Sequence, residues 1–290
     1  MIETAPELAH VPLSVDPAAV EQILVQVCQQ EIVSRFGSLR ADQIRAKSTP
    51  HDVVTDADAA AEEAYGDALT ALLPGSMVVG EEAVAADAAV LDRLSSGQPI
   101  WVIDPLDGTG NYVRGIPRFG TILALVIGGH VRNGWIYDPN NENMVSGERG
   151  RPTRFNGHAV DLAAYAARSL KEMSGRLGLH GIKPEEGPML KARVTAAVNA
   201  LVSHRCSALD YQRLLAGDID FLISTNTLPW DHAAGVVLYR GAGGIVRDLN
   251  GRPYDVTRRD QMIIAAPTEE VWNILRDIVA RSVPGATLVL

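Results

Sequence analysis

The chain has 290 residues, of which 47% are hydrophobic, and this is enough for a large buried core. Its formal net charge of −9 at pH 7 disfavours nonspecific binding to nucleic acid or anionic membranes. Two cysteines, Cys28 and Cys206, are too few for a disulfide framework or a cysteine zinc site. Because neither a signal-peptide pattern nor an apolar run of eighteen residues occurs, we expect a cytoplasmic protein with no membrane or nucleic-acid partner.

The N-terminal half alternates helical and strand patterns. Asp16 followed by Pro17 predicts the start of an amphipathic helix that extends to about residue 36 and carries Cys28 on its apolar face. The next expected elements are a helix over about 56–73, strands at 77–79 and 100–103, and a β-meander over 120–147 with a Gly128-Gly129 turn.

The C-terminal half shows the helix and strand alternation of α/β proteins. Helices are expected near 207–216, at 231–241 and from 268, and strands at 219–223, 245–249 and 262–265. Residues 171–192 are rich in glycine and proline, which predicts an irregular and mobile segment.

Residues 101–109 are the most informative segment. An apolar run ends at Asp104 and Asp107, and Gly108 and Thr109 follow. Two carboxylates about 4 Å apart repel by roughly 4 kcal/mol at an effective dielectric near 20, so converging aspartates are costly unless they are protonated, spread apart or neutralised by a hard cation such as Mg2+. Asp-Pro and Asp-Gly are also common turn dipeptides, so this segment alone leaves a turn and a metal site open.

Two other segments end in acids in the same way. Residues 78–82 end in Glu81 and Glu82, and Asp231 stands at the start of an alanine- and valine-rich helix. A short helix beginning after Gly108 would direct free N–H groups toward a phosphate. Acids for a metal together with a phosphate cradle indicate phosphoryl chemistry.

These segments resemble the signature motifs of a known family. Gly80-Glu81-Glu82, Asp104 to Thr109 and Trp230 to Gly235 are similar to three motifs of the inositol monophosphatase family. Residues 47–58 resemble its N-terminal motif, with the matching positions Lys47, Asp52, Thr55 and Asp58. The motifs occur in the family's order over about 47–250.

The resemblance implies a fold and an organisation. The expected fold is an α/β (α+β) layered αβαβα sandwich of the inositol monophosphatase and fructose-1,6-bisphosphatase type. We place the N-terminal half at 1–150, with an antiparallel sheet and most metal ligands, and the C-terminal α/β half at 151–290, contributing Asp231 and substrate specificity. The resemblance also implies a homodimer and inhibition by lithium.

The resemblance implies two or three Mg2+ ions. One would be held by Glu81, Asp104 and the Leu106 carbonyl, and a second by Asp104, Asp107 and Asp231. Glu82 is interpreted as a supporting or surface acid, and Lys47 either neutralises a loop over the site or is solvated.

The implied catalytic residues are Thr109, Asp58 and Glu81. Thr109 would position the nucleophilic water with Asp58 behind it, since a threonine hydroxyl alone is a poor base. Asp58 also completes a capping box with Thr55, and both roles can hold together. The implied contacts to substrate and phosphate are Asp107, Gly108, Thr109, Arg205, Ser207 and Asp231.

The implied activity is Mg2+-dependent hydrolysis of a small phosphate monoester. The glutamate that inositol monophosphatases usually carry shortly before Trp-Asp is absent from residues 221–227, and the turn at 205–208 is altered, with Arg205 able to meet a second anion or face solvent. Histidinol phosphate, fructose 1,6-bisphosphate, a nucleotide 3′,5′-bisphosphate and NADP therefore stay open as substrates beside inositol phosphate.

Two alternatives remain. Some bacterial family members act as accessory binding proteins in transcription or ribosome assembly, although the intact acid set favours catalysis. Asp56-Ala57-Asp58, with the later pair Asp218 and Asp220, superficially resembles haloacid-dehalogenase phosphatases. That chemistry requires the first aspartate at the end of an apolar strand, whereas this segment is typical of a helix cap.

Overall fold

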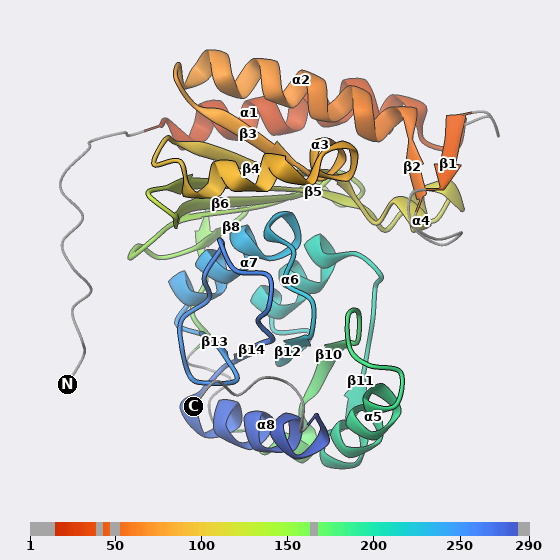
Figure 1. The fold of residues 1–290 in the computed structure, drawn as a ribbon, viewed down its shortest axis with the longest axis vertical. Helices are drawn as coiled ribbons and strands as arrows, with labels where there is room; N and C mark the ends of the chain where they lie inside the picture. The colour runs from red at the N-terminus through yellow and green to blue at the C-terminus, as the bar shows by residue number, and fades with distance from the viewer. Residues whose placement is uncertain (1–14, 39–42, 47–52, 163–167, 284–290) are drawn as a thin grey trace.

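The computed structural model describes residues 15–38, 43–46, 53–162 and 168–283. Within them, layers of helices and sheets alternate (Figure 1). Two helices cover a seven-stranded sheet, two more lie at the centre, and a further two cover a five-stranded sheet. This is the expected αβαβα sandwich.

The first layer consists of α1 (Pro17–Val27) and α2 (Asp56–Leu72). Asp16 caps α1 as predicted, because its Oδ1 accepts a hydrogen bond from the Ala18 N–H at 3.0 Å. The helical path continues as a π turn (Cys28–Ile32) and a 3-10 turn (Val33–Arg35). Cys28 is buried against the first sheet, as its place on the apolar face predicted.

The seven strands lie in the order β3-β4-β5-β6-β7-β8-β9. Only β3 and β4 pair in parallel; the other neighbours are antiparallel. Gly128 and Gly129 both have positive φ and form the predicted β5–β6 turn. The strand bounds are β3 (Met77–Gly80), β4 (Ile100–Asp107), β5 (Gly120–Ile127), β6 (His130–Asp138), β7 (Asn143–Glu148), β8 (Arg154–Phe155) and β9 (His158–Ala159).

Shorter elements surround this sheet. The chain passes through α3 (Glu81–Ala86) and a 3-10 segment (Ala88–Ser95) between β3 and β4, and through α4 (Thr109–Val113) after β4. The strands β1 (Ile44–Ala46) and β2 (Val53–Thr55) pair separately.

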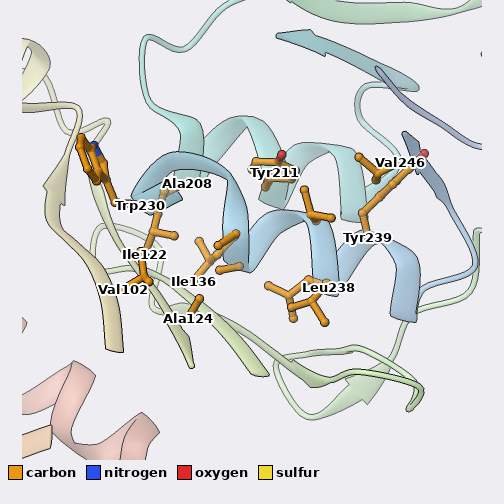
Figure 2. Close-up of a cluster of buried hydrophobic side chains, with 14 of the residues drawn as sticks. Val102, Ile122, Ala124, Ile136, Ala208, Tyr211, Trp230, Leu238, Tyr239 and Val246 are labelled. Atoms are coloured by element: carbon orange, nitrogen blue, oxygen red, sulfur yellow. The ribbon is translucent and has the colours of Figure 1, made fainter. Parts of the chain in front are cut away.

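The central layer consists of α6 (Ser207–Ala216) and α7 (Pro229–Gly241). Figure 2 shows its core, in which Ile122 and Ile136 of the first sheet lie near Trp230 and Leu238 of α7. Gly134 permits this close approach: a Cβ there would lie 2.8 Å from Val237 Cγ1 and 2.9 Å from Ala234 backbone atoms.

The second sheet has the order β11-β10-β12-β14-β13. Strand β10 is parallel to both of its neighbours, and the other pairs are antiparallel. Its strands are β10 (Ser174–Gly178), β11 (Ala200–Leu201), β12 (Phe221–Ser224), β13 (Ile245–Asp248) and β14 (Ile263–Ala266), and its covering helices are α5 (Glu186–Ala197) and α8 (Glu269–Ser282).

The prediction of an irregular segment over 171–192 holds only for residues 179–185, which lie between β10 and α5 and form no helix or strand, and is wrong for the rest. It contains a short 3-10 turn (Leu170–Glu172), strand β10 and the start of α5. Gly175 is required for packing rather than for a turn, since a Cβ there would lie 2.5 Å from the Phe221 ring. A glycine in a strand carries the same composition signal as one in a loop.

The proposed division near residue 150 stays a prediction. The first sheet extends to Ala159, and one hydrophobic cluster joins Val102 and Ile136 to Leu222 and Leu238.

Among the described residues, no helix combines the length and the apolar character that a bilayer span requires.

Candidate active site

Three aspartates converge where β4 meets the start of α7. Asp104 and Asp107 end β4 and are 2% and 8% exposed, and Asp231 lies in the first turn of α7. Carboxylate oxygens of the three lie within 4.8 Å of one another. Residues three apart on a regular strand point to opposite faces, but the pairing register with β5 shifts between Asp104 and Asp107. This irregularity lets both side chains join Asp231.

Hydrogen bonds from α6 fix the cluster. The Ala208 N–H donates to Asp107 Oδ2 at 2.5 Å, and the Cys206 thiol donates to the same oxygen at 3.1 Å. Ser207 hydrogen-bonds Asp231 through its side chain. Cys206 is a site contact that sequence reasoning missed, because only the tertiary structure brings it to Asp107.

Glu81 reaches the cluster from the first residue of α3. Its side chain hydrogen-bonds Asp104. Helix α3 is in turn held by Glu62 of α2, whose two carboxylate oxygens accept the N–H groups of Glu82 and Ala83, each at 2.8 Å. Glu62 carries no sequence signal, because the two N–H groups that donate to it lie twenty and twenty-one residues away along the chain.

Thr109 and Asp58 form the predicted pair. The Thr109 hydroxyl lies 3.0 Å from Asp58 Oδ1 and 2.9 Å from the Leu106 carbonyl oxygen. Asp58 Oδ2 accepts the Thr55 N–H at 2.8 Å and the Thr55 hydroxyl at 2.6 Å. The capping box is therefore present, and the other Asp58 oxygen faces Thr109.

The electrostatics of the cluster fit a hard divalent cation. Burial, followed by the nearby Glu81 carboxylate, raises the pKa of Asp104 well above its usual value. Burial and the neighbouring Asp107 also raise the pKa of Asp231. The pKa of Asp107 rises to about 6, mainly through burial and against the hydrogen bond from Ala208. Buried carboxylates that repel one another would be neutralised by a bound divalent cation, and Mg2+ prefers such oxygen ligands.

The structure also describes two further predicted site residues, Gly108 and Arg205. Gly108 has φ +88°, and a Cβ there would lie 2.7 Å from the Arg118 carbonyl oxygen, so the turn into α4 excludes larger residues. Arg205 is exposed and has φ +53°. Lys47 and Asp52 lie outside the described residues.

A buried ionic group adjoins Asp231. Arg176 Nε of β10 donates to Asp210 Oδ2 at 2.8 Å, and His204 Nδ1 lies 2.7 Å from Asp210 Oδ1. The positive charge of Arg176 lowers the pKa of Asp231 in part. Sequence reasoning missed this group because the strand that carries Arg176 was expected to be irregular.

Residues 221–227, which lack the family glutamate, contribute Ser224 to a buried hydrogen-bond network around His232. Ser224 Oγ lies 3.1 Å from His232 Nε2, and the Tyr211 hydroxyl lies 2.9 Å from His232 Nδ1. Burial lowers the pKa of His232 to about 3, so the imidazole is neutral. His232 therefore supports α7 and is not directed at the aspartates.

The residues of the dehalogenase-like alternative do not converge. Asp56 begins α2 and pairs with Arg45 at 2.8 Å, whereas Asp220 pairs with Arg168 at 2.9 Å in the second half. Asp58 is the N3 residue of the capping box at the start of α2, as its sequence indicated.

The chain is therefore an αβαβα sandwich in which buried aspartates converge at the end of β4 and the start of α7. This combination defines the class to which the protein belongs. The model of the inositol monophosphatase family matches residues 15–282. The chain belongs to the inositol monophosphatase family.

Named relatives agree with this membership. The chain is 30% identical over 213 residues to the fructose-1,6-bisphosphatase/inositol-1-monophosphatase of Thermotoga maritima, covering 73% of this chain and 78% of the relative. It is 30% identical over 240 residues to the Nus factor SuhB of Pasteurella multocida, covering 80% and 85%. The crystal structure of the extragenic suppressor protein SuhB from Bartonella henselae superposes with a TM-score of 0.75 at 29% identity, covering 90% of this chain and 98% of that one.

Proposed function

We propose that this protein hydrolyses a small phosphate monoester with Mg2+. The observation that carries the proposal is the convergence of Asp104, Asp107 and Asp231 within 4.8 Å beside the hydrogen-bonded pair Thr109 and Asp58. Family membership supports it, since relatives such as the Thermotoga protein are named phosphatases. Two or three Mg2+ ions would be held by Glu81, Asp104, Asp107, Asp231 and the Leu106 carbonyl.

Two groups of residues would have different roles in the reaction: the acids would bind the metal, and Thr109 with Asp58 would orient the attacking water. Mg2+, when bound, would shield the acids and the phosphate charge and lower the pKa of an attacking water. Thr109 would accept a hydrogen bond from that water while its own hydroxyl donates a hydrogen bond to Asp58, which would orient the water toward phosphorus. The N–H groups at the very start of α4 would face the phosphate oxygens, whereas those of Asn111 and Tyr112 donate to the Gly108 carbonyl.

The choice of substrate is proposed from residues 221–227 and Arg205, which are not among the acids proposed to bind metal. No glutamate stands in residues 221–227 to bind sugar hydroxyls, and Arg205 is exposed near the turn into α6. Inositol monophosphate is the first candidate through family membership, and a substrate with a second anionic group is the alternative.

Phosphate release from a panel of monoesters tests both the chemistry and the substrate. The panel contains inositol 1-phosphate, histidinol phosphate, fructose 1,6-bisphosphate and adenosine 3′,5′-bisphosphate, each assayed with Mg2+ and with EDTA. We expect one substrate to be hydrolysed far faster than the rest, and only with Mg2+. Negligible release from every substrate by folded protein would contradict the proposal.

The metal site is tested separately by thermal unfolding. We expect Mg2+ to raise Tm, because a ligand that binds only the folded state stabilises it. Asp107→Asn should remove most of this shift, since asparagine keeps an oxygen for the Ala208 N–H but loses the charge. Asp218→Asn, at an exposed residue paired with Arg213, should keep the full shift. An equal Mg2+ shift in both variants would exclude Asp107 as a ligand.

An accessory binding role is the second candidate. It is favoured by the 30% identity with the Nus factor SuhB of Pasteurella multocida. A pull-down with Asp107→Asn protein distinguishes the two functions: stoichiometric partners retained by this variant would support binding that is independent of catalysis.

Homodimer formation and lithium inhibition are proposed from the family alone. Size-exclusion chromatography with light scattering should give about twice the 31.1 kDa chain mass. Li+ should inhibit Mg2+-dependent phosphate release when added at constant ionic strength, with Na+ as the control.

A further inference from the structure

A cavity of about 930 Å³ lies at the C-terminal end of α7, away from the aspartates. It is bounded by the β5–β6 turn, the β7–β8 turn, the last turns of α7 and residues 253–257. Arg240 lines it nine residues after Asp231, a separation of about 13 Å along a helix axis. None of the acids proposed to bind metal lines this α7 cavity.

The charges of the α7 cavity are unbalanced. Arg149, Arg151 and Arg240 line it, and Asp255 is the acid among its lining residues. Arg151 already pairs with Glu148 at 3.0 Å. Asp255 Oδ1 accepts the Thr257 N–H at 2.9 Å and the Thr257 hydroxyl at 2.7 Å. Its carboxylate is therefore engaged in its own turn.

Two guanidinium groups remain without a partner. Within the described part of the chain, the side chains of Arg149 and Arg240 make no hydrogen bond or ion pair. Arg149 and Arg240 are both solvent-exposed as whole residues, and partial desolvation, followed by the charges of Arg149 and Arg247, lowers the pKa of Arg240. Cations that repel one another beside a cavity would be stabilised by an anion placed between them.

The carbonyl end of α7 does not oppose an anion here. A helix C-terminus normally carries partial negative charge through its unpaired carbonyls. The Leu238 carbonyl accepts the Thr153 hydroxyl at 2.6 Å, and the Ala242 carbonyl accepts the Leu162 N–H at 3.0 Å. These bonds occupy the carbonyls that would otherwise repel a negative ligand.

The remaining walls are apolar. Val131, Val236, Val237 and Val256 line the α7 cavity together with Pro152 and Pro253. Its volume lies at the upper end of the roughly 300–1,000 Å³ range of small-molecule sites, and is much larger than inorganic phosphate requires. Cations beside apolar walls match a ligand with both an anionic group and an apolar body.

We propose that the α7 cavity is a second binding site, separate from the acid cluster, for an organic phosphate with an apolar or aromatic body. The phosphate would bridge Arg149 and Arg240, and the body would pack on the valines. This site does not depend on the proposed phosphatase activity.

Calorimetric titration of the full chain in EDTA with ADP and with pyrophosphate tests this site. ADP supplies phosphates and an aromatic body, whereas pyrophosphate supplies the charge alone. We expect ADP to bind at least tenfold more tightly than pyrophosphate. Arg149→Ala and Arg240→Ala should each weaken ADP binding at least tenfold.

Controls separate this site from the acid cluster and from general charge effects. Arg154→Ala removes an exposed arginine outside the cavity, whose guanidinium bonds the Gly157 carbonyl, and should change the ADP affinity less than twofold. Asp107→Asn should also leave it within twofold. If Arg240→Ala fails to fold, Arg240→Lys replaces it. This variant should weaken ADP binding, because lysine cannot make the bidentate contact of a guanidinium with a phosphate.

Two outcomes would overturn the proposal. One is the absence of ADP and pyrophosphate binding by the folded wild-type protein. The other is binding that Asp107→Asn abolishes while Arg149→Ala and Arg240→Ala leave it unchanged, because this result would place the anion at the acid cluster.

Discussion

Asp58 joins the folding of α2 to the chemistry proposed for Thr109. One carboxylate oxygen accepts bonds from Thr55 at the helix start, and the other faces the Thr109 hydroxyl. Burial raises the pKa of Asp58 to about 6 against these hydrogen bonds. A carboxylate with this pKa accepts a proton near neutral pH more readily than a solvent-exposed aspartate does.

Thr109 provides the sharpest residue-scale test of the mechanism. Thr109→Val keeps the shape of the side chain and removes the hydroxyl, so we expect phosphate release with Mg2+ to fall by about 10²-fold or more. Thr109→Ser keeps the hydroxyl and should retain most of the rate. Equal rates in the two variants, measured at saturating substrate, would exclude the hydroxyl from catalysis.

The raised pKa of Asp58 also predicts a pH dependence of stability. The folded carboxyl holds its proton more tightly than the unfolded one, with a pKa of about 6 against 3.8. Ionisation of Asp58 therefore destabilises the folded state increasingly as pH rises from about 4 to about 6, with a full effect on the order of 3 kcal/mol above that window. Burial raises the pKa values of Asp104, Asp107 and Asp231 in the same direction.

Thermal unfolding in EDTA between pH 4.5 and 8 measures this effect. We expect Tm to fall as pH rises through the window, and Asp58→Asn to flatten the profile. Excess Mg2+ should reduce the fall, since a cation stabilises the ionised acids. A metal-free Tm that increases steadily toward pH 8 would contradict the pKa directions.

At the scale of elements, α3 owes its position to a side chain of another helix. Glu81 and Glu82 begin α3, and Gly80 at its N-cap makes no side-chain capping bond. The Glu62 carboxylate of α2 supplies the missing acceptors for two N–H groups of α3. Gly80 makes room for it, since a Cβ there would lie 2.1 Å from Glu62 Cδ.

Glu62→Ala should therefore loosen the element that carries Glu81. Loss of two charge-assisted hydrogen bonds is expected to lower the free energy of unfolding by about 1–3 kcal/mol and to weaken the Mg2+ dependence of phosphate release. Glu63→Ala, at the exposed neighbour on the same helix, is the matched control and should change stability by less than about 0.5 kcal/mol. Equal denaturation midpoints for the two variants would contradict the capping role.

At the scale of the whole molecule, the central layer joins both sheets and the candidate active site. Helix α7 carries Asp231 in its first turn, packs on the first sheet and contacts β13 of the second. The cluster that surrounds it takes residues from both sheets (Figure 2). Loss of packing at α7 should therefore disturb both halves and the acids together.

Gly134→Ala tests this coupling. The added Cβ would approach Ala234 backbone atoms to 2.9 Å, so overpacking should lower the free energy of unfolding by about 1–3 kcal/mol. We expect one unfolding transition at lower Tm. Gly66→Ala in α2 is the control: its Cβ would lie 3.8 Å from Val78 Cγ2, and alanine favours the helix by about 1 kcal/mol. Two separate transitions in the Gly134 variant would contradict a shared core.

The sequence by itself determined the elements whose signals are local. The Asp16 cap, the Thr55 and Asp58 capping box and the Gly128-Gly129 turn are where their patterns predicted, because caps and turns are fixed by neighbouring residues. The motif resemblance also predicted which acids would converge, although periodicity alone could not bring Asp231 to Asp107.

Only the tertiary structure decided the features that depend on close packing between distant segments. Strand β10 was missed because Gly175 is selected by the Phe221 ring rather than by a turn. Glu62, Cys206 and Arg176 acquire their contacts across the layers, and the α7 cavity forms from four separate segments. Such contacts follow from how the layers pack, which no local pattern of residues encodes.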